Sequence, residues 1–223
     1  MRLSVIFKLS LVTSALLGIA IQIGLFSGEL RLSVLNYYTL MSNILCAAYF
    51  FAAMVHEANK GGTLFPLLEG AVVQGIAVTG LVYHFMLSGS FHMQGTLSLS
   101  SMLLHYAVPL MAVMDWLLFS QKGRYTRRSP FVWLLVPDGY FIYAVIRIAL
   151  GASIGYGGSR YPYPFIDADV LGWGQVLING AVLNLFFILL GFVFVTLDRL
   201  LARGSASAKE KTAGESASRA GKP

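Results

Sequence analysis

Six apolar runs, each long enough to cross a lipid bilayer, constrain this 223-residue chain more than any other feature. A helix needs about 20 apolar residues to span the hydrocarbon core. Since a backbone in lipid must satisfy its own hydrogen bonds, we expect all six runs to be helices. The predicted fold class is therefore all-α, a polytopic membrane protein with six transmembrane helices in one bundle. The runs are Leu3–Phe26, Asn36–Val55, Pro66–Ser88, Leu97–Phe119, Pro130–Gly151 and Trp173–Leu200.

The bulk composition agrees with a membrane protein. Hydrophobic residues form 57% of the chain and charged residues 12%, and that charged share is about half of what a soluble domain carries. With a mean hydropathy of +0.70, the composition excludes the soluble, fibrous, disulfide-stapled and intrinsically disordered classes. Cys46 is the one cysteine, so no internal disulfide and no cysteine-based metal site can form.

The basic residues predict how the bundle crosses the membrane. Thirteen lie on the side that holds both termini, whereas the opposite side receives Arg31 and Arg160, with Arg147 near the outer end of the fifth run. Cytoplasmic loops carry the excess of Lys and Arg, so we expect both termini in the cytoplasm. The charge is then a topology signal, and we expect no nucleic-acid partner. The thirteen are Arg2, Lys8, Lys60, Lys122, Arg124, Arg127, Arg128, Arg199, Arg203, Lys209, Lys211, Arg219 and Lys222.

The composition changes near residue 203. Residues 1–203 form the predicted transmembrane domain, and residues 204–223 consist mainly of Gly, Ala, Ser, Lys and Glu. A segment of this kind buries too little apolar surface to offset its chain entropy. We therefore expect residues 204–223 to be a disordered cytoplasmic tail.

The longest extracytoplasmic connection, Ala152–Gly172, combines glycines, prolines and aromatic residues. From Gly155 onward it reads GYGGSRYPYPFIDADVLG. We expect an ordered lid over the outer mouth of the bundle, in which Tyr161, Tyr163 and Phe165 cover polar groups beneath. An aromatic belt at the membrane interface is the alternative.

Polar residues inside the runs are costly unless they face protein or water. Four polar or small residues of the second run recur at i, i+3, i+4 and i+7, on one face of a helix: Thr39, Ser42, Asn43 and Cys46. One interpretation is interhelical packing through small, hydrogen-bonding side chains, which is common in membrane bundles. The other is a functional site.

The fourth run carries His105, with Pro109 four residues later. Proline has no N–H to donate to the carbonyl four residues before it, so we expect a free His105 carbonyl and a kink beside the imidazole. Ser101 and Ser98 lie one and two turns earlier on the same face. The histidine is either a structural hydrogen-bonding group or a base.

Polarity gathers toward the predicted outer leaflet. Counted at 1.5 Å per residue, Thr39 and His105 both lie in the outer half of the membrane. Further polar side chains of the third and fifth runs lie at similar or somewhat greater depth: His84, Tyr140, Tyr143 and Arg147.

Two carboxylates lie apart from this cluster. Asp115 is near the cytoplasmic end of the fourth run, where we expect an ion pair with Lys122 or Arg124. Asp138, within Pro137-Asp138-Gly139, lies at a predicted helix break of the fifth run, and the sequence assigns it no role.

Several kinds of site are excluded by spacing. The four histidines do not form the paired arrangement of a membrane haem site. Ser88-Gly89-Ser90 is a weak match to the serine elbow of an intramembrane protease. No Walker loop, dinucleotide glycine fingerprint or HExxH motif occurs. We therefore expect neither a metal nor another cofactor.

Three short stretches resemble a known family when they are taken in order. They are Tyr37-Tyr38-Thr39-Leu40-Met41-Ser42-Asn43, Leu104-His105-Tyr106-Ala107-Val108-Pro109 and Tyr161-Pro162-Tyr163-Pro164-Phe165-Ile166-Asp167. Together they resemble the androgen-induced-gene-like six-span membrane threonine hydrolases, over nearly the whole chain before the tail. The Leu-Met-Ser-Asn that follows Thr39 is the pattern of the prokaryotic branch of this family. The resemblance thus implies a cell membrane, the inner membrane of a bacterium, as the location.

The resemblance implies hydrolysis of fatty-acid esters of hydroxy fatty acids by a threonine nucleophile and a histidine on another helix. By position, these match Thr39 and His105, and the Pro-Phe of the outer loop matches Pro164 and Phe165. A threonine hydroxyl becomes a nucleophile when a base within about 2.6–3.2 Å takes its proton. No carboxylate is placed to orient His105, so we expect a dyad.

The same residues admit other functions. In a non-enzymatic small transporter or lipid-binding module, the polar cluster binds a ligand, and in a structural bundle it is satisfied packing. Transporters usually carry repeats and paired broken helices, which this sequence does not show. The expected partners are membrane lipids or lipid esters, which enter sideways from the outer leaflet. The expected oxyanion donors are Ser42, Asn43 or a tyrosine, and the full set of supporting positions is Ser42, Asn43, His84, Tyr143, Arg147, Tyr163, Pro164 and Phe165.

Overall fold

The computed structural model describes residues 2–59, 62–88 and 96–220, with the side chains of 96–97, 157 and 205–220 outside this description. The described residues form helices and no β-strand. Six helical spans are long and apolar enough to cross a membrane. The prediction of an all-α protein with six spans is therefore confirmed.

The spans begin and end within a few residues of the predicted runs, except that the sixth extends further at both ends. Two of the short elements, η2 and η3, are π-helical turns, and they lie inside the third and fourth spans. In chain order the elements are α1 (Leu3–Gln22), η1 (Leu32–Asn36), α2 (Tyr38–Asn59), α3 (Pro66–Val82), η2 (Tyr83–Leu87), α4 (Thr96–Met102), η3 (Leu103–Ala107), α5 (Val108–Phe119), α6 (Ser129–Trp133), α7 (Leu135–Ala149), η4 (Tyr156–Gly158), η5 (Pro164–Ile166) and α8 (Ala168–Ala220).

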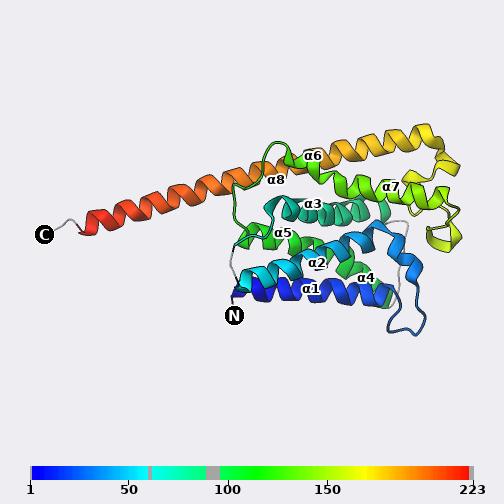
Figure 1. Cartoon of the computed structure of the whole chain (residues 1–223), viewed down its shortest axis with the longest axis horizontal. Helices are drawn as coiled ribbons and strands as arrows, with labels where there is room; N and C mark the ends of the chain where they lie inside the picture. Colours follow the sequence, from blue (N-terminus) through cyan, green and yellow to red (C-terminus); the bar gives the residue numbers. More distant parts are fainter. Residues whose placement is uncertain (1, 60–61, 89–95, 221–223) are drawn as a thin grey trace.

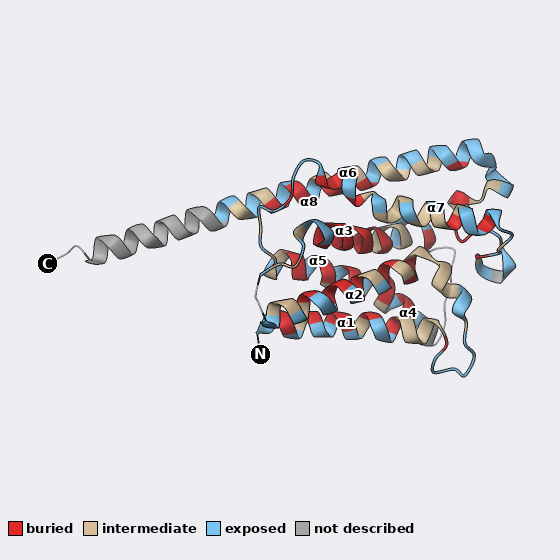
Figure 2. Cartoon of the chain, in the orientation of Figure 1, coloured by how far each residue is buried: buried red, intermediate tan, exposed pale blue. Residues whose placement is uncertain are grey.

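The helix α3 occupies the centre of the bundle. It packs against α2 and α5 on one side and against α6, α7 and α8 on the other (Figure 1). Residues 69–79 of α3 are buried without interruption, as the colouring of Figure 2 shows. A helix that is surrounded on all faces needs no polar stripe, and the polar Glu69, Gln74 and Thr79 of this run are buried together with its apolar residues.

Two glycines let neighbouring elements approach the α3 backbone. A Cβ at Gly70 would lie 2.1 Å from the ring of Trp133 in α6, and a Cβ at Gly80 would lie 2.8 Å from the carbonyl oxygen of His105 in η3. Small residues permit such close approach between membrane helices. Gly80 therefore sets the distance between α3 and the histidine turn.

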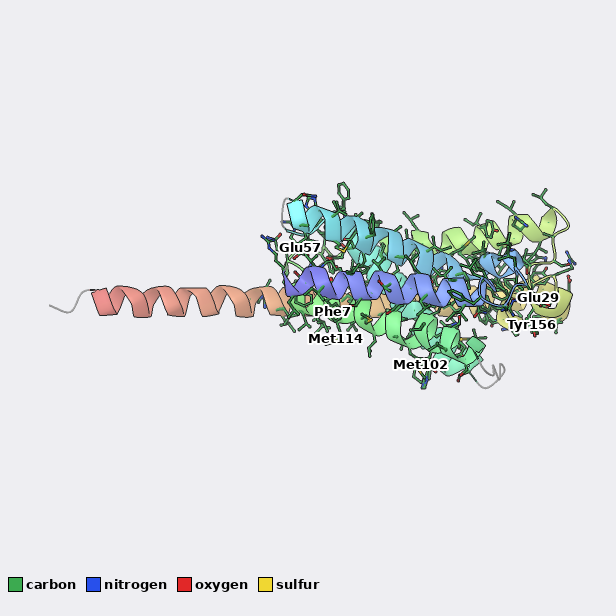
Figure 3. The ribbon with its side chains drawn as sticks, turned by 90° about the horizontal axis from the view of Figure 1, so that it is seen from below. Phe7, Glu29, Glu57, Met102, Met114 and Tyr156 are labelled. Carbon is green, nitrogen blue, oxygen red and sulfur yellow. The ribbon has the colours of Figure 1, made fainter. Side chains whose placement is uncertain are left out.

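The connections lie at two opposite ends of the bundle. Glu57 marks the end at which α1 begins, and Glu29 and Tyr156 mark the other end (Figure 3). We call the second one the lid end, because it holds residues 152–167.

A buried ion network ties three helices together near the beginning of α1. The Lys8 ammonium lies 3.1 Å from a carboxylate oxygen of Asp115 in α5 and 3.1 Å from one of Glu57 in α2. Ser4 donates a hydrogen bond to Glu57. The expected pairing of Asp115 with Lys122 or Arg124 is therefore wrong: Lys8 reaches Asp115 across the interface of α1 and α5.

The break in the fifth span lies one turn earlier than predicted. The helix is interrupted at Leu134, between α6 and α7, and α7 runs through Pro137, Asp138 and Gly139. Pro137 cannot donate to the carbonyl of the residue four positions before it, so the interruption falls beside Trp133 and not at the Pro-Asp-Gly triplet itself.

The last helix, α8, is kinked at Gly172, which has a φ of 73° and a ψ of 153°. That conformation lies in the region of positive φ that favours glycine. Beyond the kink the helix continues to Ala220. The disorder expected for residues 204–223 stays a prediction.

The fifth and sixth spans are the least covered by protein. Only 17% and 22% of their apolar windows are buried, against 39% to 56% for the other spans. Figure 2 shows the exposed faces along α7 and α8. In a membrane these faces would contact lipid, and they flank the site described next.

Candidate functional site

The structure brings the two central residues of the predicted site into contact. The hydroxyl oxygen Oγ1 of Thr39, in the first turn of α2, lies 3.2 Å from Nε2 of His105 in η3. Both side chains are buried. The residues are 66 positions apart in the chain, so only the packing of α2 against the fourth span creates this pair.

The partners of the second ring nitrogen of His105, Nδ1, determine which of the two ring nitrogens carries the hydrogen. Nδ1 is 3.1 Å from the backbone carbonyl oxygen of Ser101 and 3.2 Å from the Ser101 hydroxyl. A carbonyl can only accept, so Nδ1 carries the hydrogen in the neutral ring. Nε2 is then an acceptor, and the Thr39 hydroxyl donates to it. This is the arrangement that a general base requires.

A π-helical turn presents the imidazole. Residues Leu103–Ala107 form η3, and Pro109 follows in the first turn of α5. The kink predicted from Pro109 thus takes the form of a π-bulge, a feature that occurs frequently at functional sites. The close approach of Gly80 to the His105 carbonyl fixes this turn against α3.

Tyr83 of η2 packs against the imidazole. Its ring stacks on that of His105, with a centroid distance of 3.7 Å and an interplanar angle of 17°. Its hydroxyl accepts a hydrogen bond of 2.9 Å from Ser101. Tyr83 begins η2, so the two π-helical turns of the protein's described part face each other across this contact.

The backbone of Thr39 is anchored from its own helix. The amide of Asn43 donates to the Thr39 carbonyl at 2.8 Å and to the Leu104 carbonyl at 3.2 Å, and the Ser42 hydroxyl donates to the same Thr39 carbonyl at 3.1 Å. Ser42 also shares a hydrogen bond of 2.8 Å with Thr79 of α3. Ser42 and Asn43 therefore position Thr39, and their donors are engaged with backbone carbonyls. That use differs from the oxyanion role expected for them.

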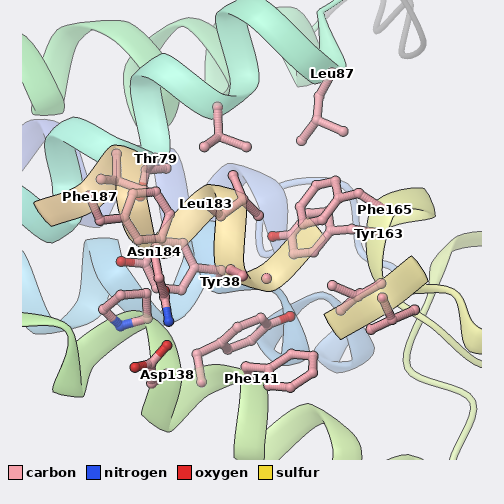
Figure 4. Close-up of a pocket in the computed structure, with 18 of the residues that line it drawn as sticks. Tyr38, Thr79, Leu87, Asp138, Phe141, Tyr163, Phe165, Leu183, Asn184 and Phe187 are labelled. Atoms are coloured by element: carbon pink, nitrogen blue, oxygen red, sulfur yellow. The ribbon is translucent and has the colours of Figure 1, made fainter. Parts of the chain in front are cut away.

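A cavity of about 360 Å³ lies beside Thr39, between the beginning of α2, α3, α7, η5 and α8 (Figure 4). Ligand cavities in proteins begin near this size, at roughly 300 Å³. Thr39 and Tyr83 line it, whereas His105 does not, so the imidazole is reached through the threonine. Leu177 of α8 lines the cavity and is 63% exposed. The wall formed by α8 therefore also faces the outside of the bundle.

The loop at the lid end forms one wall of the cavity. Tyr163, Phe165 and Ile166 all line the cavity. The rings of Tyr163 and Phe165 stack with a centroid distance of 5.2 Å. Asn179 of α8 donates 2.8 Å to the Phe165 carbonyl, which holds η5 against the last helix. Tyr161 is also buried, but in a separate cluster with Ile154.

The phenol of Tyr163 lies next to Thr39. Burial raises the pKa of Tyr163 to about 12, and the neighbouring Thr39 offsets part of this rise. The hydroxyl is therefore neutral at physiological pH and available as a hydrogen-bond donor in the cavity.

The other predicted supporting residues lie outside the cavity. His84 is exposed and contacts the Tyr106 hydroxyl at 3.3 Å. Tyr143 donates 2.6 Å to the Asn36 side chain, and the exposed Arg147 lies over the Tyr143 ring. Pro164 is exposed at the start of η5. Depth alone grouped His84, Tyr143 and Arg147 with the pair, but helical rotation turns them away from it. Pro164 was implied by the resemblance and not by depth.

Three lining residues could not be assigned from the sequence. Tyr83 and Asn184 carry no motif, and Asp138 received no role. A polar residue within an apolar run was the available signal for Asp138 and Asn184.

Comparisons with known protein families, with curated proteins and with solved structures found no match. The chemistry must therefore be judged from the residues of the site.

Proposed function

We propose that the protein is an intramembrane hydrolase of lipid esters, with Thr39 as the nucleophile and His105 as the general base. The observation that carries the proposal is the 3.2 Å contact between Oγ1 of Thr39 and Nε2 of His105. The Nδ1 contact with Ser101 supports the base-competent tautomer. The same chemistry is what the resemblance to the androgen-induced-gene-like threonine hydrolases implies.

The reaction would proceed in two halves. In the first, the Thr39 oxygen attacks the ester carbonyl while its proton moves to Nε2 of His105, and the ester C–O bond then breaks as the leaving alcohol takes that proton. In the second, a water molecule loses a proton to Nε2 and attacks the acyl-threonine. The acid leaves, and Thr39 regains its proton.

Tyr163 is the best-placed donor for the oxyanion of this reaction. Ser42 and Asn43 are engaged with backbone carbonyls, whereas the Tyr163 phenol lines the cavity beside Thr39. A neutral donor fixed in a water-poor site stabilises developing negative charge without reorganisation. We therefore assign this role to Tyr163.

The cavity suits a lipid as the substrate. Its walls are mostly apolar and aromatic, and it lies next to the sparsely covered spans α7 and α8. An ester could reach Thr39 sideways from the bilayer, without crossing water. The exposed Leu177 marks the wall through which it would pass.

We further propose a cell-membrane location with both termini in the cytoplasm, which puts the lid end outside. The support is the distribution of basic residues, thirteen against two, together with the positive-inside rule. Reporter fusions after Phe119 and after Gly204 should read cytoplasmic, and a fusion after Ser88 should read external. A Ser88 fusion that reports the same side as the Phe119 fusion would contradict this topology.

Hydrolysis by purified protein tests the proposed activity. Protein in detergent should hydrolyse a long-chain p-nitrophenyl ester, and Thr39→Ala and His105→Ala should each abolish turnover. The double variant should be no worse than either, because residues that act as a unit lose activity together. Thr39→Ser should retain part of the activity, since a hydroxyl remains. A folded Thr39→Ala protein with full turnover would leave the non-enzymatic, lipid-binding alternative.

A further inference from the structure

Two polar side chains face each other at one end of the cavity. Asp138 comes from α7 and Asn184 from α8, and both line the cavity. In Figure 4 the Asn184 amide points toward the Asp138 carboxylate, at the end of the cavity away from Tyr163 and Phe165. Nothing in the proposed reaction uses either of them.

Within the described part of the chain, neither side chain has a hydrogen-bond or ion-pair partner. Asp138 lies in the first turn of α7, where the helix dipole favours a carboxylate, but no backbone N–H donates to its side chain. At roughly 1.5 Å per residue, Asp138 lies about 16 Å from the Ala149 end of its helix, and Asn184 lies about 18 Å from Gly172. Both are therefore deep in the membrane-spanning segments.

Unpartnered polar groups at this depth are expensive, and an ionisable residue inside a span indicates a functional site. A carboxylate only accepts hydrogen bonds, whereas the Asn184 amide can donate and accept. The pair is complementary to a ligand group that donates hydrogen bonds, such as a hydroxyl or an ammonium. A free carboxylate on the ligand would be repelled.

We propose that Asp138 and Asn184 form a recognition site for a hydrogen-bond donor on the bound lipid. The substrates would then be esters that carry a hydroxyl or an ammonium group beyond the ester. Esters that carry a free acid would be disfavoured, so the preference of this chain would differ from that for the fatty-acid esters of hydroxy fatty acids, which the resemblance implies. This inference rests on the proposed function, because it names the substrate class for the site at Thr39.

Binding of ethers that cannot be hydrolysed tests the inference apart from catalysis. The four probes share a hexadecyl chain: 1-O-hexadecylglycerol, hexadecyl 2-aminoethyl ether, hexadecyl methyl ether and hexadecyloxyacetic acid. Ligand affinity is measured from the thermal stabilisation of purified protein in detergent. The glycerol ether or the aminoethyl ether should bind ~10-fold or more tightly than the methyl ether, as expected for a hydrogen bond to a charged group. The acid should bind most weakly.

Variants of the pair distinguish the two donors. Asp138→Leu and Asn184→Leu should each remove the preference over the methyl ether. Asp138→Asn keeps an acceptor and loses the charge, so it should keep a preference for the hydroxyl ligand and lose one for the ammonium ligand. Glu29→Gln, a change at an exposed carboxylate of the lid end, is the matched control and should bind as the wild type does.

The outcomes separate this inference from the proposed activity. Equal binding of all four ethers, or a preference that survives in folded Asp138→Leu or Asn184→Leu protein, would overturn the recognition site even if the protein hydrolyses esters. Conversely, a protein without esterase activity that still shows the preference, and loses it in these variants, would refute the hydrolase and retain the recognition site.

Discussion

Replacing Gly80 with alanine tests how tightly the histidine turn is held. The new Cβ would lie 2.8 Å from the His105 carbonyl oxygen and 3.2 Å from the Cβ of Pro109. Ordinary contact distances require a shift of at least ~0.6 Å. One neighbour is backbone and the other belongs to a proline ring, so a side-chain rotation cannot relieve the overlap.

The displacement should affect catalysis more than folding. Overpacking of this size costs about 1–3 kcal/mol of stability. A misplacement near 1 Å in a catalytic group can lower the rate by about 10²-fold. We therefore expect Gly80→Ala to fold, to lose about 1–3 kcal/mol of unfolding free energy, and to hydrolyse esters ~10- to 100-fold more slowly than the wild type.

The assay compares kcat and the thermal unfolding temperature in detergent. Gly174→Ala in α8 is the matched control, because a Cβ at Gly174 meets no atom within 4 Å. This control should keep full activity and gain up to about 1 kcal/mol from the better helix propensity of alanine. If Gly80→Ala were as active and as stable as Gly174→Ala, the argument that Gly80 positions His105 would fail.

Two further predictions concern the ion network and the lid. Lys8→Met leaves Asp115 buried without its partner and should destabilise the protein by about 3–5 kcal/mol, measured by thermal unfolding. Adding Asp115→Asn to this variant should recover most of the lost stability. If no stability were recovered, the pairing of Lys8 with Asp115 would be contradicted. Tyr163→Phe should lower kcat by ~10²- to 10³-fold with little change in KM. The pKa of Tyr163 is raised from 10.0 to about 12. Its contribution to the free energy of unfolding should therefore be complete below pH 10 and be lost as the pH rises toward 12. The stability of Tyr163→Phe should lack this part of the decline between pH 10 and pH 12. If the wild type and Tyr163→Phe lost stability equally over this range, the raised pKa would be contradicted.

The spans could be predicted because lipid imposes a simple requirement. Length and hydropathy alone identified the six helices, and each predicted run overlaps one span. The break in the fifth span lies one turn before the predicted position, at Leu134. A proline interrupts the helix near the carbonyl four residues earlier, to which it has no N–H to donate, and not at its own position.

The central pair was accessible from the sequence, but its surroundings were not. Thr39 and His105 stand out as polar residues in apolar runs, and the resemblance implied that they act as a pair. Helix rotation and packing determine the surrounding contacts. They place the Tyr83 ring on His105, and they bring the Ser42 and Asn43 side chains to the Thr39 carbonyl. Residue depth does not encode rotation.

The partner of Asp115 illustrates a second limit. Proximity in the chain favoured Lys122 and Arg124, whereas Lys8 reaches Asp115 from a helix more than one hundred residues away. The packing of α1 against α5 decides this pairing. In the same way, Asp138 and Asn184 acquire a shared environment only when α7 and α8 enclose the cavity.

Covalent labelling with a long-chain alkyl fluorophosphonate tests the central claim most directly. The reagent phosphonylates a nucleophile that a base has activated, and mass spectrometry of the labelled protein locates the adduct. The account predicts a single adduct on Thr39 in the wild type, none in Thr39→Ala, and labelling that is lost or strongly slowed in His105→Ala. An adduct on another residue, or undiminished labelling of folded Thr39→Ala protein, would contradict the assignment of Thr39 as the nucleophile.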